Sequence, residues 1–173
     1  MFLGQEYKIL DWFYIHFTEN NGMAFGMELG GDWGKLTLSL FRIVFVAFIV
    51  VYLIKLVNKK ADQILISSLS LVLAGAIGNI IDGVAYGVLF SDSYHQTASF
   101  LPESGGYAPM FFGKVVDMFY FPMFKGYLPE WLPYWGGEYA VFFRPVFNIA
   151  DAAISIGVGI MILFQKRIMK EID

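Results

Sequence analysis

The sequence predicts a mainly α-helical membrane protein, a bundle of three transmembrane helices with a small β-sheet on its outer, periplasmic face. Of the 173 residues, 57% are hydrophobic and only 16% are charged, whereas a soluble domain carries about 25% charged residues. The hydrophobic residues gather in three long blocks, which is typical of membrane spans. Aromatic and glycine-containing segments outside these blocks have the composition of strands and turns.

Each block is long enough to cross a hydrocarbon layer of about 30 Å as a helix. We interpret residues 1–173 as a single membrane-embedded domain, and the expected segments follow in chain order. They are an outer β segment at 1–35, spans at 36–56 and 64–85, an outer loop with strands at 86–145, and a span at 146–165. Arg42 lies within the first span, near one end, where a long side chain can reach the interface.

Basic residues indicate which side of the membrane each segment occupies. They are Lys55, Lys59 and Lys60 between the first two spans, and Lys166, Arg167 and Lys170 after the third. Both groups are expected to be cytoplasmic, because short cytoplasmic segments are enriched in lysine and arginine. Three spans then place the N-terminal segment outside, although it shows no signal-peptide pattern. We therefore expect that one further span precedes Met1 in the complete protein.

The outer segments contain the expected strands. Residues 12–18 are aromatic and β-branched, and Asn21-Gly22 after them is typical of a tight turn. Residues 91–113 are expected to be an irregular loop, and residues 114–124 a second strand. Residues 126–138 combine tryptophan and tyrosine with proline, which is typical of a segment at the membrane–water interface.

Composition excludes several classes of function. The chain has no cysteine, which rules out disulfides, thiol catalysis and cysteine metal sites. Its two histidines, His16 and His95, are far apart and have no ligand spacing, so neither a metal nor another cofactor is expected. A net charge of −3 offers no basic patch for nucleic acid.

Polar residues within the spans point to a site. Gly75, Gly78, Asn79 and Asp82 follow a spacing of i, i+3, i+4 and i+7, which puts them on one helical face with Asp82 at the end of its span. Asp151 lies about one turn inside the third span. A carboxylate in a span costs about 2.5–3.5 kcal/mol and must face protein or water.

Asp117 ends an apolar run near the outer surface, so it could meet Asp82 and Asp151 at one depth. Two adjacent carboxylates do not both ionise easily, and such a pair can activate water while donating a proton to a carbonyl. This is the chemistry of aspartyl proteases. For any one of these acids taken singly, a helix cap or an ion pair with Arg144 or Lys114 is favoured over a catalytic role.

Four motifs occur in order along the chain. They are Asn20–Phe25 (NNGMAF), Gly75–Asp82 (GAIGNIID), Gly113–Asp117 (GKVVD) and Phe147–Ser155 (FNIADAAIS). Together they resemble the lipoprotein signal peptidases, or signal peptidase II, over nearly the whole chain. The resemblance implies an aspartic endopeptidase of the bacterial inner membrane, with its active site on the periplasmic side. It also implies cleavage before a diacylglyceryl-modified cysteine of prolipoproteins.

The resemblance assigns the catalytic roles to Asp117 and Asp151. The residues that match positions lining and bracing the active site of the family are Asn20, Gly22, Asn79, Asp82 and Asn148. Asp82 therefore has a supporting role by resemblance, which its spacing alone does not determine. Membrane lipid is expected as a partner because the substrate is lipidated, and the protein is expected to be a monomer.

The chain departs from the family pattern in three ways. The first of four family spans has no counterpart here. Gly83 occupies the position where the family usually has arginine, so the positive charge near Asp82 is either missing or supplied by Arg144 or Lys114. Residues 86–112 form a longer outer segment than is common, which we interpret as an inserted loop and a candidate lid over the substrate.

A membrane transporter or channel subunit that uses the acids as a proton or cation relay is the alternative function. Acids within spans often mark ion pathways. Relay residues, however, are distributed through the depth of the membrane, whereas these three acids lie near one face. Transporters also usually have more spans and internal repeats.

Overall fold

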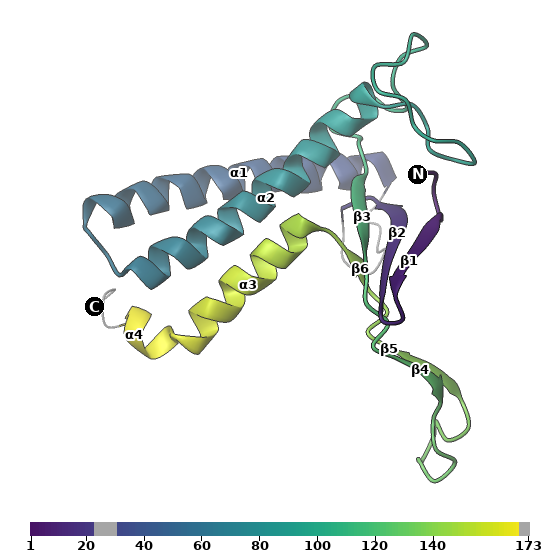
Figure 1. Ribbon diagram of the computed structural model, residues 1–173. Coiled ribbons are helices and arrows are strands. Elements are labelled where there is room, and N and C mark those ends of the chain that lie inside the picture. Colours follow the sequence, from purple (N-terminus) through teal and green to yellow (C-terminus); the bar gives the residue numbers. More distant parts are fainter. Residues whose placement is uncertain (23–30, 170–173) are drawn as a thin grey trace.

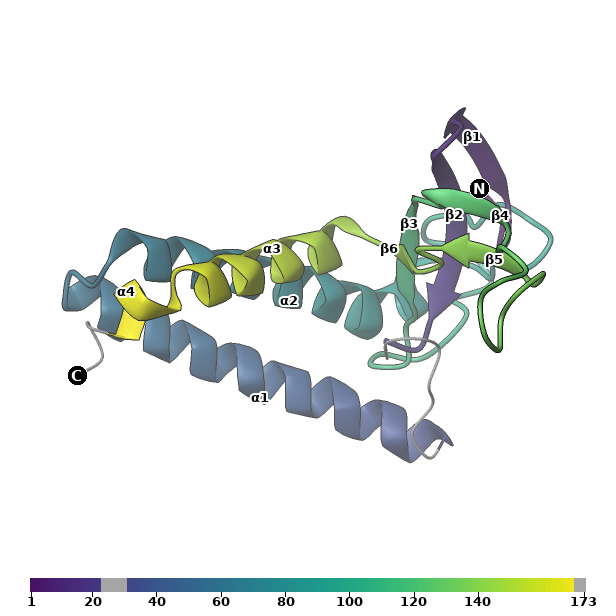
Figure 2. The same cartoon turned by 90° about the horizontal axis from the view of Figure 1, so that it is seen from below.

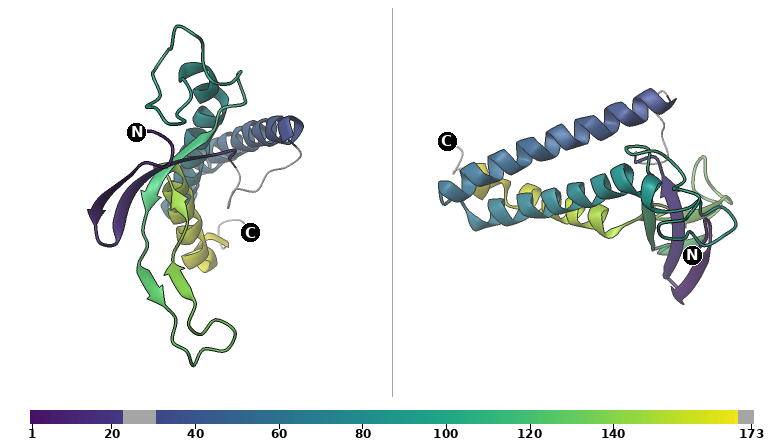
Figure 3. Two further views of the ribbon diagram at one scale, coloured as in Figure 1. Left: turned by 90° about the vertical axis from the view of Figure 1, so that its right-hand side faces the viewer. Right: turned by 90° about the horizontal axis from the view of Figure 1, so that it is seen from above.

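The computed structural model describes residues 1–22 and 31–169, as a layer of helices with a β-sheet across one end. In Figure 1 the helices run across the view and the sheet stands at their right-hand end. The N-terminus lies beside the sheet, and α4 lies at the opposite end of the helices (Figure 1). Two perpendicular directions of view show α1 diverging from α2 and α3 toward the sheet (Figures 2 and 3).

Within the described residues, two helices, α1 and α2, are long and apolar enough to span a membrane. The helices are α1 (Gly31–Asn58), α2 (Gln63–Leu89), α3 (Ile149–Leu163) and α4 (Gln165–Met169). With 28 and 27 residues, α1 and α2 are each about 40 Å long at about 1.5 Å per residue. Most large apolar side chains of α1, such as Phe41, Val44 and Phe48, are exposed, as expected for a helix surrounded by lipid.

Two of the expected spans lie within longer helices. The segment 36–56 lies within α1, which begins at Gly31. The segment 64–85 lies within α2, which continues to Leu89. Asp82 therefore lies about two turns before the end of α2, and its carboxylate has hydrogen-bond partners there. The third helix has only 15 residues, and the chain turns at Phe164 into α4.

Glycines bring α2 and α3 into close contact. A Cβ on Gly75 would collide with the backbone oxygen of Ala150 and approach Cγ1 of Ile154 at 2.7 Å. A Cβ on Gly157 would lie 2.5 Å from the backbone oxygen of Ser68. Small residues allow helices in membranes to approach to backbone contact, so these two positions set the spacing of the helix pair.

The far ends of the helices are held by apolar packing and one ion pair. The buried residues there are Leu56, Ala61, Leu65 and Ile168. Asp62 caps α2 by accepting from the backbone N–H of Ile64 at 2.7 Å. The Arg167 side chain of α4 donates to the same carboxylate from Nε at 2.6 Å. This pair links the end of α4 to the start of α2.

In the part of the chain that the structure describes, the strands form two antiparallel sheets. They are β1 (Glu6–Leu10), β2 (Phe13–Asn20), β3 (Val115–Tyr120), β4 (Phe124–Tyr127), β5 (Tyr139–Phe142) and β6 (Val146–Phe147). The four-stranded sheet has the order β1-β2-β3-β6, and β4 and β5 form a separate hairpin. The register pairs Thr18 with Asp117, and Phe119 with Phe147. The sheet therefore sets the end of β2 beside Asp117 and the start of α3.

The predicted strand at 12–18 is confirmed as β2. The predicted run at 114–124 contains β3 and the first residue of β4, while β1, β5 and β6 were not predicted. The expected turn at Asn21-Gly22 agrees with a φ of +90° at Gly22, a value that glycine adopts without strain. The rest of that motif, residues 23–25, lies outside the described residues.

The loop at 91–113 is irregular, as predicted, but it is fixed to the end of α2. Backbone hydrogen bonds of 2.8–3.1 Å join them: Leu101 to Leu89, Tyr107 to Phe90, Ala108 to Gly87, Phe111 to Val84 and Gly113 to Gly83. A Cβ on Gly106 would collide with the backbone of α2. The loop thus packs along the last turns of the helix.

Candidate active site

Asp151 lies in the first turn of α3, in a reciprocal cap with Asn148. Asn148 Oδ1 accepts from the backbone N–H of Asp151 at 2.9 Å, and Asp151 Oδ2 accepts from the backbone N–H of Asn148 at 3.3 Å. Such a capping box satisfies donors that a helix start leaves unpaired. It also fixes both side chains relative to the helix axis.

The amide of Asn148 joins two other parts of the chain. Its Nδ2 donates to Asp117 Oδ1 at 2.8 Å and to Asn79 Oδ1 at 3.1 Å. Asn79 Nδ2 in turn donates to Asp151 Oδ1 at 2.8 Å. Asn148 therefore hydrogen-bonds to Asp117 directly. It is linked to Asp151 in two ways, through the capping box and through Asn79, so the four residues form one hydrogen-bond network.

Asp117 is buried, with 4% of its surface exposed, on the face of β3 that it shares with Val115. Asn20 Nδ2 donates to its second oxygen, Oδ2. Burial and the neighbouring charge of Asp151 raise the pKa of Asp117 to about 6, against the opposing effect of the two asparagine donors. A carboxyl group with this pKa can hold a proton near neutral pH.

Asp82 braces the strand that carries Asp117. Its Oδ2 accepts from the backbone N–H of Val116 at 3.2 Å, and the Tyr86 hydroxyl also hydrogen-bonds to it. The charge of Asp82 acts on Asp117 as well. The structure thus brings the three acids to one end of the helices.

Lys114 does not supply a positive charge to Asp82, contrary to one of the two expectations. Its ammonium pairs with Glu19 of β2 at 2.9 Å, and Glu19 also accepts from Ser93 Oγ at 2.7 Å. Arg144 is exposed, between β5 and β6. Lys114 therefore helps to join β2 to β3.

Arg42 is a cation near the site that sequence reasoning did not place there. Its Nη2 donates to the backbone oxygen of Gly22, and its charge acts on Asp151. Gly22 N–H donates to Asn20 Oδ1 at 2.6 Å, so contacts run from Arg42 through Gly22 and Asn20 to Asp117. The available signal in the sequence was that Arg42 is a charged residue inside an apolar span. The sequence interpretation placed its side chain at the membrane interface instead of near the acids.

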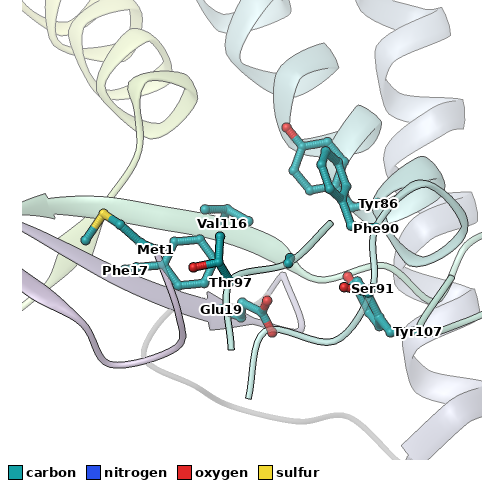
Figure 4. Close-up of a pocket in the computed structure, with 10 residues that line it drawn as sticks. Met1, Phe17, Glu19, Tyr86, Phe90, Ser91, Thr97, Tyr107 and Val116 are labelled. Carbon is teal, nitrogen blue, oxygen red and sulfur yellow. The ribbon is translucent and has the colours of Figure 1, made fainter. Parts of the chain in front are cut away.

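A separate cavity of about 220 Å³ lies on the other face of the sheet. Figure 4 shows Glu19, Val116, Tyr86 and Tyr107 around it. Side chains alternate along a strand, so Val116 points away from the side that holds Asp117. Residues of the 91–113 loop form part of the cavity lining, namely Ser91, Thr97, Ala98 and Tyr107. The role of residues 86–112 as a lid over the substrate stays a prediction.

The chemistry of the network is that of paired carboxyl groups. Asp117 and Asp151 are connected through one asparagine, and one of them holds its proton unusually tightly. In residues 1–22 and 31–169, no three His, Asp or Glu side chains lie close enough together to hold a metal ion.

Comparison with known proteins identifies the family. The family model for signal peptidase II matches residues 1–166. The lipoprotein signal peptidase of Porphyromonas gingivalis is 54% identical over 168 residues, covering 96% of this chain and 73% of that protein. That of Amoebophilus asiaticus is 35% identical over 172 residues, covering 98% and 68%.

Two solved bacterial membrane enzymes have the same fold. One, solved at 2.3 Å by the in meso method, has a TM-score of 0.58 at 23% identity and covers 96% of this chain and 74% of its own. The other, solved at 1.9 Å, has a TM-score of 0.54 at 26% identity and covers 94% and 76%. These matches give no support to a transporter or channel subunit. The chain belongs to the signal peptidase II family of aspartic peptidases.

Proposed function

We propose that this protein is the endopeptidase that removes the signal peptide from diacylglyceryl-modified prolipoproteins, with Asp117 and Asp151 as its catalytic pair. The observation that carries the proposal is the position of Asn148. Its single side chain binds Asp117 at 2.8 Å and caps the turn that contains Asp151. Family membership supplies the reaction class, and the named relatives supply the substrate.

The pair would hydrolyse the peptide bond with one shared proton. One carboxylate takes a proton from a water molecule, whose oxygen attacks the scissile carbonyl carbon. The protonated partner donates its proton to the carbonyl oxygen, which stabilises the tetrahedral intermediate. Collapse of the intermediate breaks the C–N bond, and the leaving amine takes up a proton. The raised pKa of Asp117 favours it as the initial proton donor.

The supporting residues fix the positions of the two catalytic carboxyl groups relative to each other. Asn79 and Asn148 hold the carboxyl oxygens of different elements together. Asp82 fixes the backbone one residue before Asp117, and Asn20, oriented by Gly22, binds Asp117 from β2. Removing any of these supports would change the geometry of the pair without removing an acid.

We further propose that the sheet lies on the periplasmic side of the inner membrane. The basic residues Lys55, Lys59, Lys60, Lys166 and Arg167 all lie at the opposite end of the helices, as the enrichment of positive charge on cytoplasmic segments requires. The third span would consist of α3 extended by α4. Its 15-residue main helix, about 22 Å long, would leave Asp151 near the level where the hydrocarbon ends.

In this orientation the substrate approaches from within the bilayer. The apolar signal peptide and the two acyl chains remain in hydrocarbon, while the scissile bond reaches the acids at the interface, where water is present. The lipid is then part of the recognised substrate, and one copy of the protein carries both acids and is sufficient for catalysis.

The test is cleavage by the purified protein in lipid nanodiscs. A precursor bearing the diacylglyceryl group is expected to give a product shortened by its signal peptide, and the same precursor without the lipid is expected to remain intact. No shortened product from the lipidated precursor would overturn the proposal. Equal cleavage of both precursors would overturn the role of the lipid.

A further inference from the structure

The β4–β5 hairpin is an arm whose large apolar surface the hydrolysis described above does not use. It spans residues 121–145 and projects sideways from the end of the helices, roughly perpendicular to their direction (Figures 1 and 3). Its exposed aromatic residues include Phe124, Tyr127, Trp131, Tyr134, Trp135 and Phe142. Such a concentration of exposed aromatic side chains on one projecting element requires a partner surface.

The two faces of the hairpin differ. Lys125 points to the face of the main sheet that is turned away from Asp117, where its ammonium lies 4.4 Å from the ring centroid of Tyr14. Because side chains alternate along a strand, Phe124 points to the opposite side, as does Phe142, its cross-strand partner. One face thus carries a cation near tyrosines, and the other carries two exposed phenylalanines.

The apolar face continues a surface that lies in lipid. The hairpin leads through β6 into α3, whose first residue, Ile149, is 74% exposed. The four tryptophans of the sequence are Trp12, Trp33, Trp131 and Trp135, and all belong to this end of the molecule, with Trp33 in the first turn of α1. Tryptophan and tyrosine concentrate where a bilayer meets water.

We propose that the β4–β5 hairpin lies in the headgroup zone of the outer leaflet, with Phe124 and Phe142 toward the acyl chains and Lys125 toward water. Its partner is the phospholipid surface itself. The inference rests on the proposed orientation of the helices but not on hydrolysis. Since the hairpin connects the strand of Asp117 to the helix of Asp151, its depth also sets the depth of the pair.

Tryptophan fluorescence in nanodiscs tests this contact. In residues 1–173 with Trp12→Phe and Trp33→Phe, in nanodiscs whose scaffold protein lacks tryptophan, the tryptophan emission comes from Trp131 and Trp135. Lipids labelled with a quencher near the headgroup are expected to reduce this emission more than lipids labelled at the end of the acyl chain. The double variant Phe124→Ser/Phe142→Ser is expected to lose most of the quenching.

A matched variant that retains only Trp33 serves as the control, because this tryptophan lies at the start of α1. Quenching of its emission shows that the labelled lipid reaches the membrane interface. Unquenched Trp131 and Trp135 beside a quenched Trp33 would overturn the proposal. The proposal would also be overturned if Trp131 and Trp135 became shielded from water only in discs that hold two copies of the protein, because a second copy would then cover the hairpin. Cleavage measured on the same discs reports the proposed function separately.

Discussion

The two ends of the α2–α3 pair are built from different chemistry. At one end Leu56, Leu65 and Ile168 pack in a buried apolar cluster, which is stabilised by close van der Waals contact. At the other end, Asn79 and Asn148 hold two acids in a buried network. Burying acids is costly unless they are well bonded, so this end is organised for a reaction rather than for stability.

The largest expected effect is the loss of cleavage when either acid of the pair is neutralised. Asp117→Asn and Asp151→Asn keep the shape of the side chain and remove a group that transfers protons. Cleavage of a lipidated precursor should fall by about 10²–10⁴-fold for each variant, the usual contribution of acid–base catalysis. Asp82→Asn should retain a larger part of the activity, since Asp82 braces β3 and its charge acts on Asp117, but it transfers no proton. Full processing by either of the first two variants would disprove the pair.

Glycine replacements at the two ends should separate stability from activity. Gly75→Val and Gly157→Val both insert atoms where α2 touches α3, and each should cost about 1–3 kcal/mol of unfolding free energy through overpacking. Only Gly75→Val adjoins Ala150, next to Asp151, so it should also lower the rate per folded molecule. Gly159→Val is the control, because a Cβ on Gly159 would meet no atom within 4 Å. Thermal unfolding combined with cleavage assays measures both quantities.

Two substitutions of Asn148 should separate its role as a helix cap from its role as the bridge between Asp117 and Asn79. Asn148→Ser keeps a side-chain acceptor for the Asp151 N–H but loses the amide that donates to Asp117 and Asn79. Asn148→Ala loses both, and it should be less stable than the serine variant by about 0.5–2 kcal/mol, the usual value of a helix cap. Both should be nearly inactive in the cleavage assay. An active serine variant would show that the bridge is dispensable.

The pH dependence of stability should reveal the protonation of Asp117. Its pKa is raised to about 6 in the folded protein, above about 3.9 in the unfolded chain, so the folded state binds the proton more tightly. The stabilisation is complete below pH 4 and is lost as the pH rises through about 6. The melting temperature in nanodiscs should fall over this range in the wild type. Asp117→Asn should remove this component, and an unchanged pH profile in that variant would assign the transition to another group.

The smallest effect is expected at the far end of the helices. Asp62→Asn weakens the contact between the start of α2 and the exposed Arg167 side chain. Exposed ion pairs contribute about 0–1 kcal/mol, so unfolding should change little and cleavage should not change. A loss of activity comparable to that of the Asn148 variants would mean that the two ends are coupled through α2.

Local patterns predicted the parts of the fold that depend on local physics. The apolar blocks predicted α1 and α2, and the run of aromatic and β-branched residues at 12–18 predicted β2. Spacing along one helix placed Gly75 and Asn79 on a common face, which the structure brings against α3. These predictions succeed because membrane hydrogen bonding and helix periodicity act within a segment.

The parts that depend on distant contacts could not be predicted. The pairing of Glu19 with Lys114 joins residues 95 positions apart, and no spacing rule anticipates it. Arg42 looked like an interfacial charge until the fold placed the end of β2 beside it. The partners of Asp82 could not be predicted either, because the bond from Val116 comes from the tertiary structure and the bond from Tyr86 comes from the next helical turn.

The attachment of the 91–113 loop to α2 has a consequence for how proteins of this kind can diversify. Backbone hydrogen bonds hold residues 83–90 against residues 101–113, so the segment between them leaves and returns at one place. Closing a longer or shorter loop between fixed ends changes the entropy only slowly with length. Insertions and deletions between these anchors can therefore accumulate over generations while Asp117, beyond the second anchor, keeps its place.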